Sequence, residues 1–344
     1  MEMAQGEIGA IRARLAGLVS AAAQLAAAEE MRCDASDSLQ ARLTQMLADD
    51  GPGPHGAVGI SSLNADGTPL QLCLTTRASR WDVRLIADPA CSIADPLHRA
   101  AVSRQAAYAV LKSARAEALT PLFDRSWDLL LAPSPQQLQQ YVEGVLWHGI
   151  TLGSPGYAAY FDMTKDAPAT AWARIAHWLG AISGFPVSCG ALVDKLAPLA
   201  LPMCAGIEGS DARKVRLKCY WRLRRAAALA EFGLPLLEHP ALRRFLATVI
   251  GARTLDGDGL VFAASVLPHD GEIHDVKIDV CAHCLQYSQQ EWRVLLAELI
   301  DSFGLSNSPV ESLFWPATRI SYVGFGVDRF GECRLNVYLG AAHG

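Results

Sequence analysis

Five cationic side chains recur at one register of similar strand-like segments: Arg84, Arg216, Lys218, Lys277 and Arg334. An arginine presents a planar fork of N–H donors and a lysine a compact charge, and both bind phosphate oxygens more strongly where water is excluded. A single such residue on a strand would usually face solvent in an ordinary ion pair. Their recurrence from segment to segment favours a pocket for a pyrophosphate group.

Three tyrosines, Tyr160, Tyr220 and Tyr338, stand at one equivalent position of these segments. A tyrosine ring face attracts a cation, by about 2 kcal/mol when the pair is desolvated. Taken singly, a tyrosine on a strand usually serves packing. Beside a pyrophosphate pocket, the three rings favour ionisation of an allylic diphosphate, in which cations hold the leaving group and aromatic walls shield the carbocation from water.

The segments that carry these side chains form a repeat. Residues 158–162, 215–220, 276–280 and 334–338 alternate apolar and polar side chains and follow one another at nearly constant spacing, and 82–86 is a fifth copy. Another extended segment and a turn rich in Gly, Pro, Asp or Ser precede each copy, as at 153–156. Each repeat therefore predicts a β-hairpin.

Stretches with helical spacing lie between the hairpins, at 96–119, 169–182, 240–251 and 289–303, with a further helical region around 6–49. Five repeats give ten antiparallel strands, and closing them into a barrel removes every exposed edge. We therefore predict an α+β fold: a ten-stranded antiparallel β-barrel of five α-β-β-α repeats, with helices outside and a solvent-filled lumen. Residues 1–50 are expected to form a helical region that packs on the barrel, and 51–344 a single barrel domain.

The two faces of each strand differ in character. One face is apolar, as at Leu72, Val83, Leu217, Ile278 and Val337, and helices are its natural cover. The opposite face carries the cations and tyrosines. The predicted lumen is therefore polar and cationic, which is the reverse of a barrel whose interior is its hydrophobic core.

This pattern resembles the aromatic prenyltransferase barrel, known as the ABBA fold or PT barrel, in its bacterial dimethylallyltryptophan-synthase type. Residues 216–220, Arg-Leu-Lys-Cys-Tyr, are similar to that type's Arg-x-Lys-x-Tyr strand, while 67–89 resembles its first hairpin and 335–339 its closing strand. The resemblance runs from about residue 57 to 340. It implies that Arg84, Arg216, Lys218, Lys277 and, more weakly, Arg334 bind a diphosphate, and that Tyr160, Tyr220 and Tyr338 shield the carbocation.

The chain departs from the family pattern at three positions. Gln71 stands where indole-binding relatives have Glu, Ala158 replaces a diphosphate-binding Lys, and Asp279 replaces a Tyr of the shield. The missing carboxylate at position 71 argues against a free tryptophan substrate. The candidate catalytic residues are then Gln71, Asp162 and Asp279, with the two aspartates as substitute bases or as partners of a cationic substrate.

The resemblance implies a prenyltransferase that moves a dimethylallyl group from dimethylallyl diphosphate to a nucleophilic acceptor. The acceptor is an aromatic or indole small molecule or a cyclic dipeptide; alternatively, it is a side chain of a ribosomal peptide. A non-catalytic barrel that binds a phosphorylated ligand is a second alternative. No cofactor is required, although Asp162 and Asp279 leave open a Mg²⁺ ion bound against the diphosphate. Cys281 and Cys284 have zinc-like spacing without a second pair, so no protein metal site is expected.

Composition limits the other classes of protein. The 344 residues carry 30 basic and 35 acidic side chains, a net charge of −5, which argues against general nucleic-acid binding. Neither a secretory signal nor an apolar stretch long enough for a membrane helix occurs, so no membrane partner is expected. Nine cysteines scattered through apolar segments fit a reducing compartment. We therefore expect a cytoplasmic protein.

Overall fold

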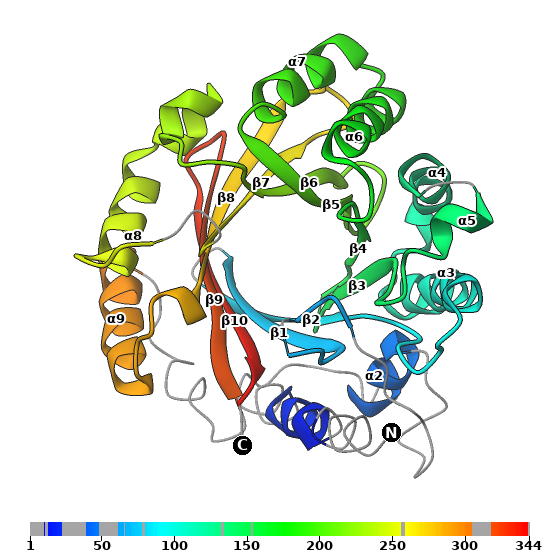
Figure 1. Ribbon diagram of the computed structural model, residues 1–344. Helices are drawn as coiled ribbons and strands as arrows, with labels where there is room; N and C mark the ends of the chain where they lie inside the picture. The colour runs from blue at the N-terminus through cyan, green and yellow to red at the C-terminus, as the bar shows by residue number, and fades with distance from the viewer. Residues whose placement is uncertain are drawn as a thin grey trace.

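The strands of the protein close into one barrel. The computed structural model describes residues 10, 13–22, 39–47, 61–64, 66–77, 80–131, 134–152, 154–255, 259–304 and 318–342. The ten strands are β1 (Leu70–Arg77), β2 (Arg80–Ala87), β3 (Leu146–Thr151), β4 (Tyr157–Asp162), β5 (Ala200–Gly209), β6 (Arg216–Leu223), β7 (Leu260–Val266), β8 (Ile273–Cys281), β9 (Thr318–Asp328) and β10 (Cys333–Ala341). Figure 1 shows this ring of strands with the helices around it.

Each strand pairs antiparallel with the strand before it, and β10 returns to β1. The closing register sets Leu72 opposite Leu339 and Thr75 opposite Asn336. The predicted ten-stranded antiparallel barrel is thereby confirmed. Because the ring is complete, none of its strands presents an unpaired edge to solvent.

The helices are α2 (Leu39–Leu47), α3 (Pro96–Ser113), α4 (Thr120–Leu130), α5 (Pro135–Leu138), α6 (Pro168–Ser183), α7 (Pro186–Leu196), α8 (Pro240–Ile250) and α9 (Gln289–Ser302), with 3₁₀ turns η1 (Glu117–Leu119), η2 (Leu229–Phe232), η3 (Pro235–Glu238) and η5 (Ala282–Cys284). Five of these α-helices begin on a proline, which has no N–H to lose in a first helical turn. Local caps also mark helix starts: Asp95 accepts from the His98 amide at the start of α3, and Ser288 and Glu291 form a capping box at the start of α9.

The predicted helix over 96–119 is too long. It ends at Ser113, after which η1 and α4 redirect the chain. Helices α4 and α7 were missed altogether. Pro121, Pro135 and Pro168 lie in the first turns of α4, α5 and α6.

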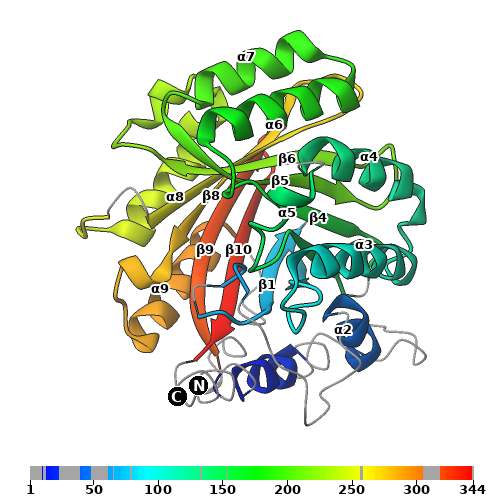
Figure 2. The ribbon, with the colours of Figure 1, turned by 45° about the vertical axis from the view of Figure 1, so that its right-hand side comes forward.

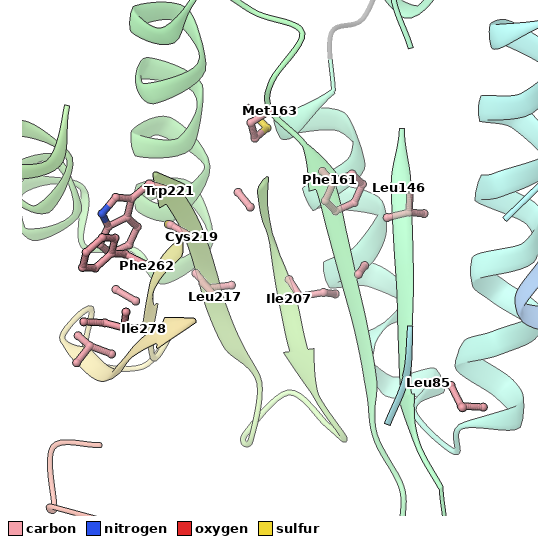
Figure 3. Close-up of a cluster of buried hydrophobic side chains, with 14 of the residues drawn as sticks. Leu85, Leu146, Phe161, Met163, Ile207, Leu217, Cys219, Trp221, Phe262 and Ile278 are labelled. Atoms are coloured by element: carbon pink, nitrogen blue, oxygen red, sulfur yellow. The ribbon is translucent and has the colours of Figure 1, made fainter. Parts of the chain in front are cut away.

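The hydrophobic core lies between the strands and the helices. The apolar face predicted from alternation, including Leu72, Leu217 and Val337, is fully buried in this layer. Figure 3 shows part of it, where Trp221 of β6 and Phe262 of β7 stack with ring centroids 6.0 Å apart. The strands therefore turn their polar face inward, and this predicted orientation is confirmed.

Two helical stretches of the N-terminal region fall within the described residues, at 13–22 and α2. Leu18, Ala22, Leu43 and Met46 are buried in the same core layer. Helix α2 lies beside α3 (Figure 2). The remainder of the predicted 1–50 region lies outside the described residues, so the division into 1–50 and 51–344 stays a prediction. Within the described helices, none combines the length and the apolar character needed to cross a bilayer.

Candidate functional site

A cavity of ≈ 420 Å³ occupies the lumen at the end where the hairpin turns lie. All five predicted cations line it: Arg84, Arg216, Lys218, Lys277 and Arg334. Tyr220 and Tyr338 line it as well, and so does Ala158. Residues separated by up to 254 positions in the sequence thus meet, because each strand contributes alternate side chains to the inner face.

Glu208, near the end of β5, lies in the middle of the cations. Its carboxylate accepts two hydrogen bonds from Arg84, each of 2.9 Å, and further ones from Arg216 (2.6 Å) and Lys218 (2.7 Å). The Tyr160 hydroxyl also donates to it, at 2.8 Å. Burial opposes its ionisation, yet Arg84, Lys218 and Arg216 hold the pKa of Glu208 well below its usual range. Glu208 therefore carries a full negative charge inside the cationic cluster.

Asp275 of β8 is the second carboxylate of the cluster and pairs with Arg216 and Arg334. It accepts from Arg216 at 2.8 Å, from Arg334 at 2.5 Å and from the Ser265 hydroxyl at 2.6 Å. Although burial raises the pKa of Asp275, Arg334 and Arg216 outweigh it and lower that pKa far below normal. The cluster is thus a row in which cations and carboxylates alternate.

Neither Glu208 nor Asp275 was predicted from the sequence as a site residue. Asp275 precedes Lys277 by two positions, so strand alternation extended backwards would have placed it on the inner face. Glu208 follows Gly206 by two positions in the same way, one residue before the end of β5. Both lie at strand ends beside turns, where sequence boundaries are least certain.

Lys218 is the most deeply buried of the arginine and lysine side chains around Glu208. Burial lowers the pKa of Lys218 to about 7, and Arg216 and Arg334 add to the decrease, against the attraction of Glu208. Near neutral pH, this lysine is therefore only partly protonated. An additional anion in the cavity would restore its charge.

Lys277 stands between two tyrosine rings. Its Nζ lies 5.1 Å from the ring centroid of Tyr220 and 5.0 Å from that of Tyr338, and it donates to the Tyr338 hydroxyl at 2.7 Å. Tyr160 packs edge-on against Tyr220, with centroids 5.6 Å apart. The three tyrosines are thus brought together as predicted from their shared register. Two of them already face a positive charge.

Asp279 lies beside this group. Its Oδ2 pairs with Lys277 Nζ at 2.6 Å, whereas its Oδ1 is buried and finds no hydrogen-bond donor among the described residues. Gly324 of β9 faces it, and a Cβ there would collide with Asp279 Oδ1. The glycine provides the space in which this carboxylate sits.

The other two catalytic candidates lie elsewhere. Gln71 donates to Asn64 Oδ1 at 3.1 Å and contacts Ser321, and Asp162 accepts from the Thr164 amide and hydroxyl at 2.8 and 2.7 Å. Burial raises the pKa of Asp162. Neither residue lines the ≈ 420 Å³ cavity. Asp162 holds the turn after β4, and Gln71 lies toward the opposite end of the lumen.

A second cavity, of ≈ 430 Å³, lies at that opposite end. Its walls include Tyr322, Ser321 and Arg319 of β9, with Tyr287 and Trp292 beside them. Tyr322 packs edge-on against Tyr338 at 5.9 Å, which links the two cavities. Tyr322 was not predicted; it is two residues before Gly324 and shares its inner face.

The carboxylates are not arranged as a metal site. Asp162 is engaged in its turn and Asp279 in its ion pair with Lys277. Within the described ranges, no group of three or more His, Cys, Asp or Glu side chains is placed to hold a metal ion. The donor set does not fit the Mg²⁺ ion that the sequence left open.

The fold is that of known prenyltransferases. No protein-family model and no curated protein sequence matches the chain. Among solved structures, it is similar to the 6-dimethylallyltryptophan synthase of Micromonospora olivasterospora (TM-score 0.76, 18% identity, 94% of this chain and 96% of the other) and the 5-dimethylallyltryptophan synthase of Streptomyces coelicolor (0.74, 18%, 95% and 97%). AnaPT of Neosartorya fischeri is also similar (0.68, 16%, 88% and 85%). The chain therefore has the ABBA, or PT-barrel, fold.

Proposed function

We propose that the protein is a prenyltransferase that transfers a dimethylallyl group from dimethylallyl diphosphate to an aromatic acceptor. The observation that carries the proposal is the position of Lys277, whose ammonium lies between the ring faces of Tyr220 and Tyr338 and beside the cationic cluster. A site that holds a cation between two rings suits an allyl cation. The similar synthases of Micromonospora and Streptomyces were solved in complex with DMASPP and Trp, which supports the same kind of donor.

The donor's diphosphate would bind to Arg84, Arg216, Lys218 and Arg334. Each guanidinium has five N–H groups, of which Glu208 and Asp275 take only some, so donors remain for phosphate oxygens. The two carboxylates also hold the guanidinium planes in fixed orientations. A preoriented set of cations stabilises the charge that develops on the leaving group.

Transfer begins as the bond between the allylic carbon and the diphosphate oxygen breaks, and the electron pair leaves with the diphosphate. The allylic carbon then bonds to a nucleophilic atom of the acceptor. The proton lost by the acceptor goes to a base, and we assign that role to Asp279, whose Oδ2 pairs with the Lys277 ammonium beside the rings and whose Oδ1 accepts no hydrogen bond from the described residues. Gln71 and Asp162 would act on the acceptor side of the lumen.

Incubation with labelled dimethylallyl diphosphate and a panel of aromatic acceptors tests the proposal. Replacement of Arg216 or Lys218 by Ala should each weaken binding of a non-hydrolysable donor analogue, since each removes a cation from the cavity. Arg213→Ala is the matched control, because Arg213 is exposed in the β5–β6 turn. Unchanged affinity in both variants would remove the donor-site assignment.

One observation favours a second candidate function. Glu208 and Asp275 already occupy part of the hydrogen-bonding capacity of the arginines. This arrangement also suits a non-catalytic barrel that binds a phosphorylated ligand. Binding of pyrophosphate together with neither transfer nor release of diphosphate would favour it. Ribosomal-peptide acceptors belong in the same panel, and transfer to a peptide side chain alone would identify the alternative acceptor.

A further inference from the structure

His274, near the start of β8, lies where this strand departs from regular pairing. Ser265 of β7 pairs with Asp275 and Val266 pairs with Ile273, so His274 is the extra residue of a β-bulge. Asp275 faces the lumen, and strict alternation would turn its neighbour toward the outer core layer. A bulge re-aims a side chain, and His274 instead lines the ≈ 420 Å³ cavity. It was not predicted from the sequence as a site residue.

His274 stands at the outer end of the cationic cluster. Along β8, Lys277 lies between the tyrosine rings and Asp275 lies among the arginines. His274 comes next, toward the hairpin turn, about 10 Å from Lys277 along the strand. A donor whose allyl group lies against the tyrosine rings would place its first phosphate among the arginines. Its terminal phosphate would then lie near His274.

The ring of His274 has a nitrogen to offer to a ligand. Its Nδ1 is buried and finds no hydrogen-bond partner among the described residues. Burial lowers the pKa of His274, and Arg216 and Arg329 add to the decrease. Asp275 and Asp328 act in the opposite direction without reversing it, so the ring is uncharged at neutral pH. Rotation about χ2 exchanges the two ring nitrogens, so either can serve a phosphate oxygen.

The neighbouring hairpins hold His274 in place. Its backbone carbonyl accepts a hydrogen bond of 2.7 Å from the Arg329 amide, and its ring packs edge-on against Phe330 with centroids 6.3 Å apart. Arg329 in turn pairs with Asp270 of the β7–β8 turn at 2.6 Å. Within the part of the chain that the structure describes, these contacts position the imidazole at the cavity wall and leave its Nδ1 unengaged.

We infer that His274 binds the terminal phosphate of the allylic diphosphate and takes up a proton from solvent as it does so. The inference rests on the proposed function and deepens it. A phosphate beside the ring adds negative charge, which favours the imidazolium form. The charged ring then donates a stronger hydrogen bond to phosphate than the neutral ring would. His274 thereby favours a diphosphate over a monophosphate.

Nuclear magnetic resonance of the full chain with ¹³C-labelled histidine tests the proton uptake. His274→Gln assigns the His274 resonance by its disappearance. In a titration from about pH 5 to pH 8, saturating pyrophosphate should move the midpoint of His274 upward, toward the ordinary value of a histidine. His269, exposed in the β7–β8 turn, should keep its midpoint. An unshifted His274 midpoint with pyrophosphate bound would overturn the inference.

Calorimetry tests the preference for the terminal phosphate. His274→Leu should weaken the binding of pyrophosphate and of a non-hydrolysable donor analogue by about tenfold. Its effect on dimethylallyl monophosphate, which lacks the terminal phosphate, should stay below about twofold. His269→Leu, five residues away on the same hairpin, is the matched control and should change no affinity. An equal loss for diphosphate and monophosphate would show a general disturbance of the cavity and reject the inference.

The inference and the proposed function fail separately. Transfer that persists with unchanged donor affinity in His274→Leu would reject the inference alone. Absence of transfer, with pyrophosphate binding that still depends on His274, would reject the prenyltransferase and keep His274 as a ligand of the terminal phosphate. Absence of pyrophosphate binding to wild type would also reject the inference. If His274→Leu fails to fold, as judged by circular dichroism, the wild-type titration decides.

Discussion

Glu208 gives the candidate site an unusual charge balance at the scale of single residues. Its carboxylate holds Arg84, Arg216 and Lys218 and accepts from Tyr160. An incoming diphosphate therefore meets oriented cations and also a fixed negative charge. Glu208 stabilises the unliganded cluster and opposes the binding of a second anion.

Glu208→Gln should raise the affinity for inorganic pyrophosphate by about tenfold, or about 1.4 kcal/mol, because it removes that repulsion. The same change should lower Tm without ligand, since Arg84 and Lys218 lose their counter-ion and Arg216 keeps only Asp275. Isothermal titration calorimetry and thermal unfolding measure the two effects. Glu298→Gln, on the exposed face of α9, is the control. Weaker pyrophosphate binding by Glu208→Gln would mean that cation orientation matters more than repulsion.

Lys218 makes donor binding dependent on pH. Its pKa of about 7 in the free protein means that it is increasingly neutral above pH 7, whereas the bound diphosphate favours its charged form. Binding then takes up a proton, so affinity falls as pH rises. Between pH 7 and 9 the donor's diphosphate changes its own protonation little, because the pKa of its last ionisation is about 6. Calorimetry in buffers of different ionisation enthalpy detects the proton, and Lys218→Met should remove both the uptake and the slope.

Tyr220→Leu tests the carbocation shield. Leucine retains apolar bulk but lacks the ring face, which is needed only once positive charge develops. Turnover should fall by about tenfold or more while the affinity for a non-hydrolysable donor analogue stays within about twofold. Single-turnover kinetics and calorimetry provide the two measurements. A loss of affinity as large as the loss of rate would assign Tyr220 to ground-state binding.

At the scale of elements, β4 and β5 lie very close together at Gly206. A Cβ there would collide with the backbone of Ala159 and Tyr160. Gly190 in α7 has no such neighbour within 4 Å. A side chain therefore does not fit at position 206, whereas position 190 has room for one.

Gly206→Ala should lower the free energy of unfolding by about 1–3 kcal/mol because the strands must separate locally. Gly190→Ala should raise it by up to about 1 kcal/mol through helix propensity. Denaturant unfolding of both variants gives the comparison. Equal effects of the two substitutions would contradict the close strand contact.

The strands were predictable because their side chains alternate strictly and the pattern repeats. The helices were less predictable from the sequence. Helix α7 was missed because it follows α6 after only Gly184 and Phe185, and a glycine followed closely by a proline usually marks the end of a helix. Similarly, the cations and tyrosines of the site were found by their shared register across the repeats, whereas Glu208 and Asp275, near strand ends, were not.

At the scale of the whole molecule, the barrel is closed by its most distant strands. Thr76 of β1 accepts a hydrogen bond from the Leu335 amide of β10 at 2.8 Å, across the closing seam. The ring forms only when the last strand arrives. Long-range closure of this kind carries a large entropy cost before its contacts form.

A chain ending at residue 331, which lacks β10, should therefore fail to form a stable monomer. Its β1 and β9 would present unpaired edges that promote association. Size-exclusion chromatography should find aggregates, and a chain ending at residue 342 should elute as the full-length protein does. A monomeric, cooperatively folded 331-residue chain would contradict the requirement for closure.

The strands form a closed wall with two different sides. The outer side packs against the helices and stabilises the fold, while the inner side lines the cavities proposed to bind substrates. Redesign of the inner wall is thereby largely uncoupled from the packing that determines foldability. Exchanges at positions that line the two cavities, such as Ala158 or Tyr322, become a route to new acceptor preferences at small cost in stability. This architecture is suited to diversification, since selection can change the side chains that contact an acceptor without rebuilding the outer core layer.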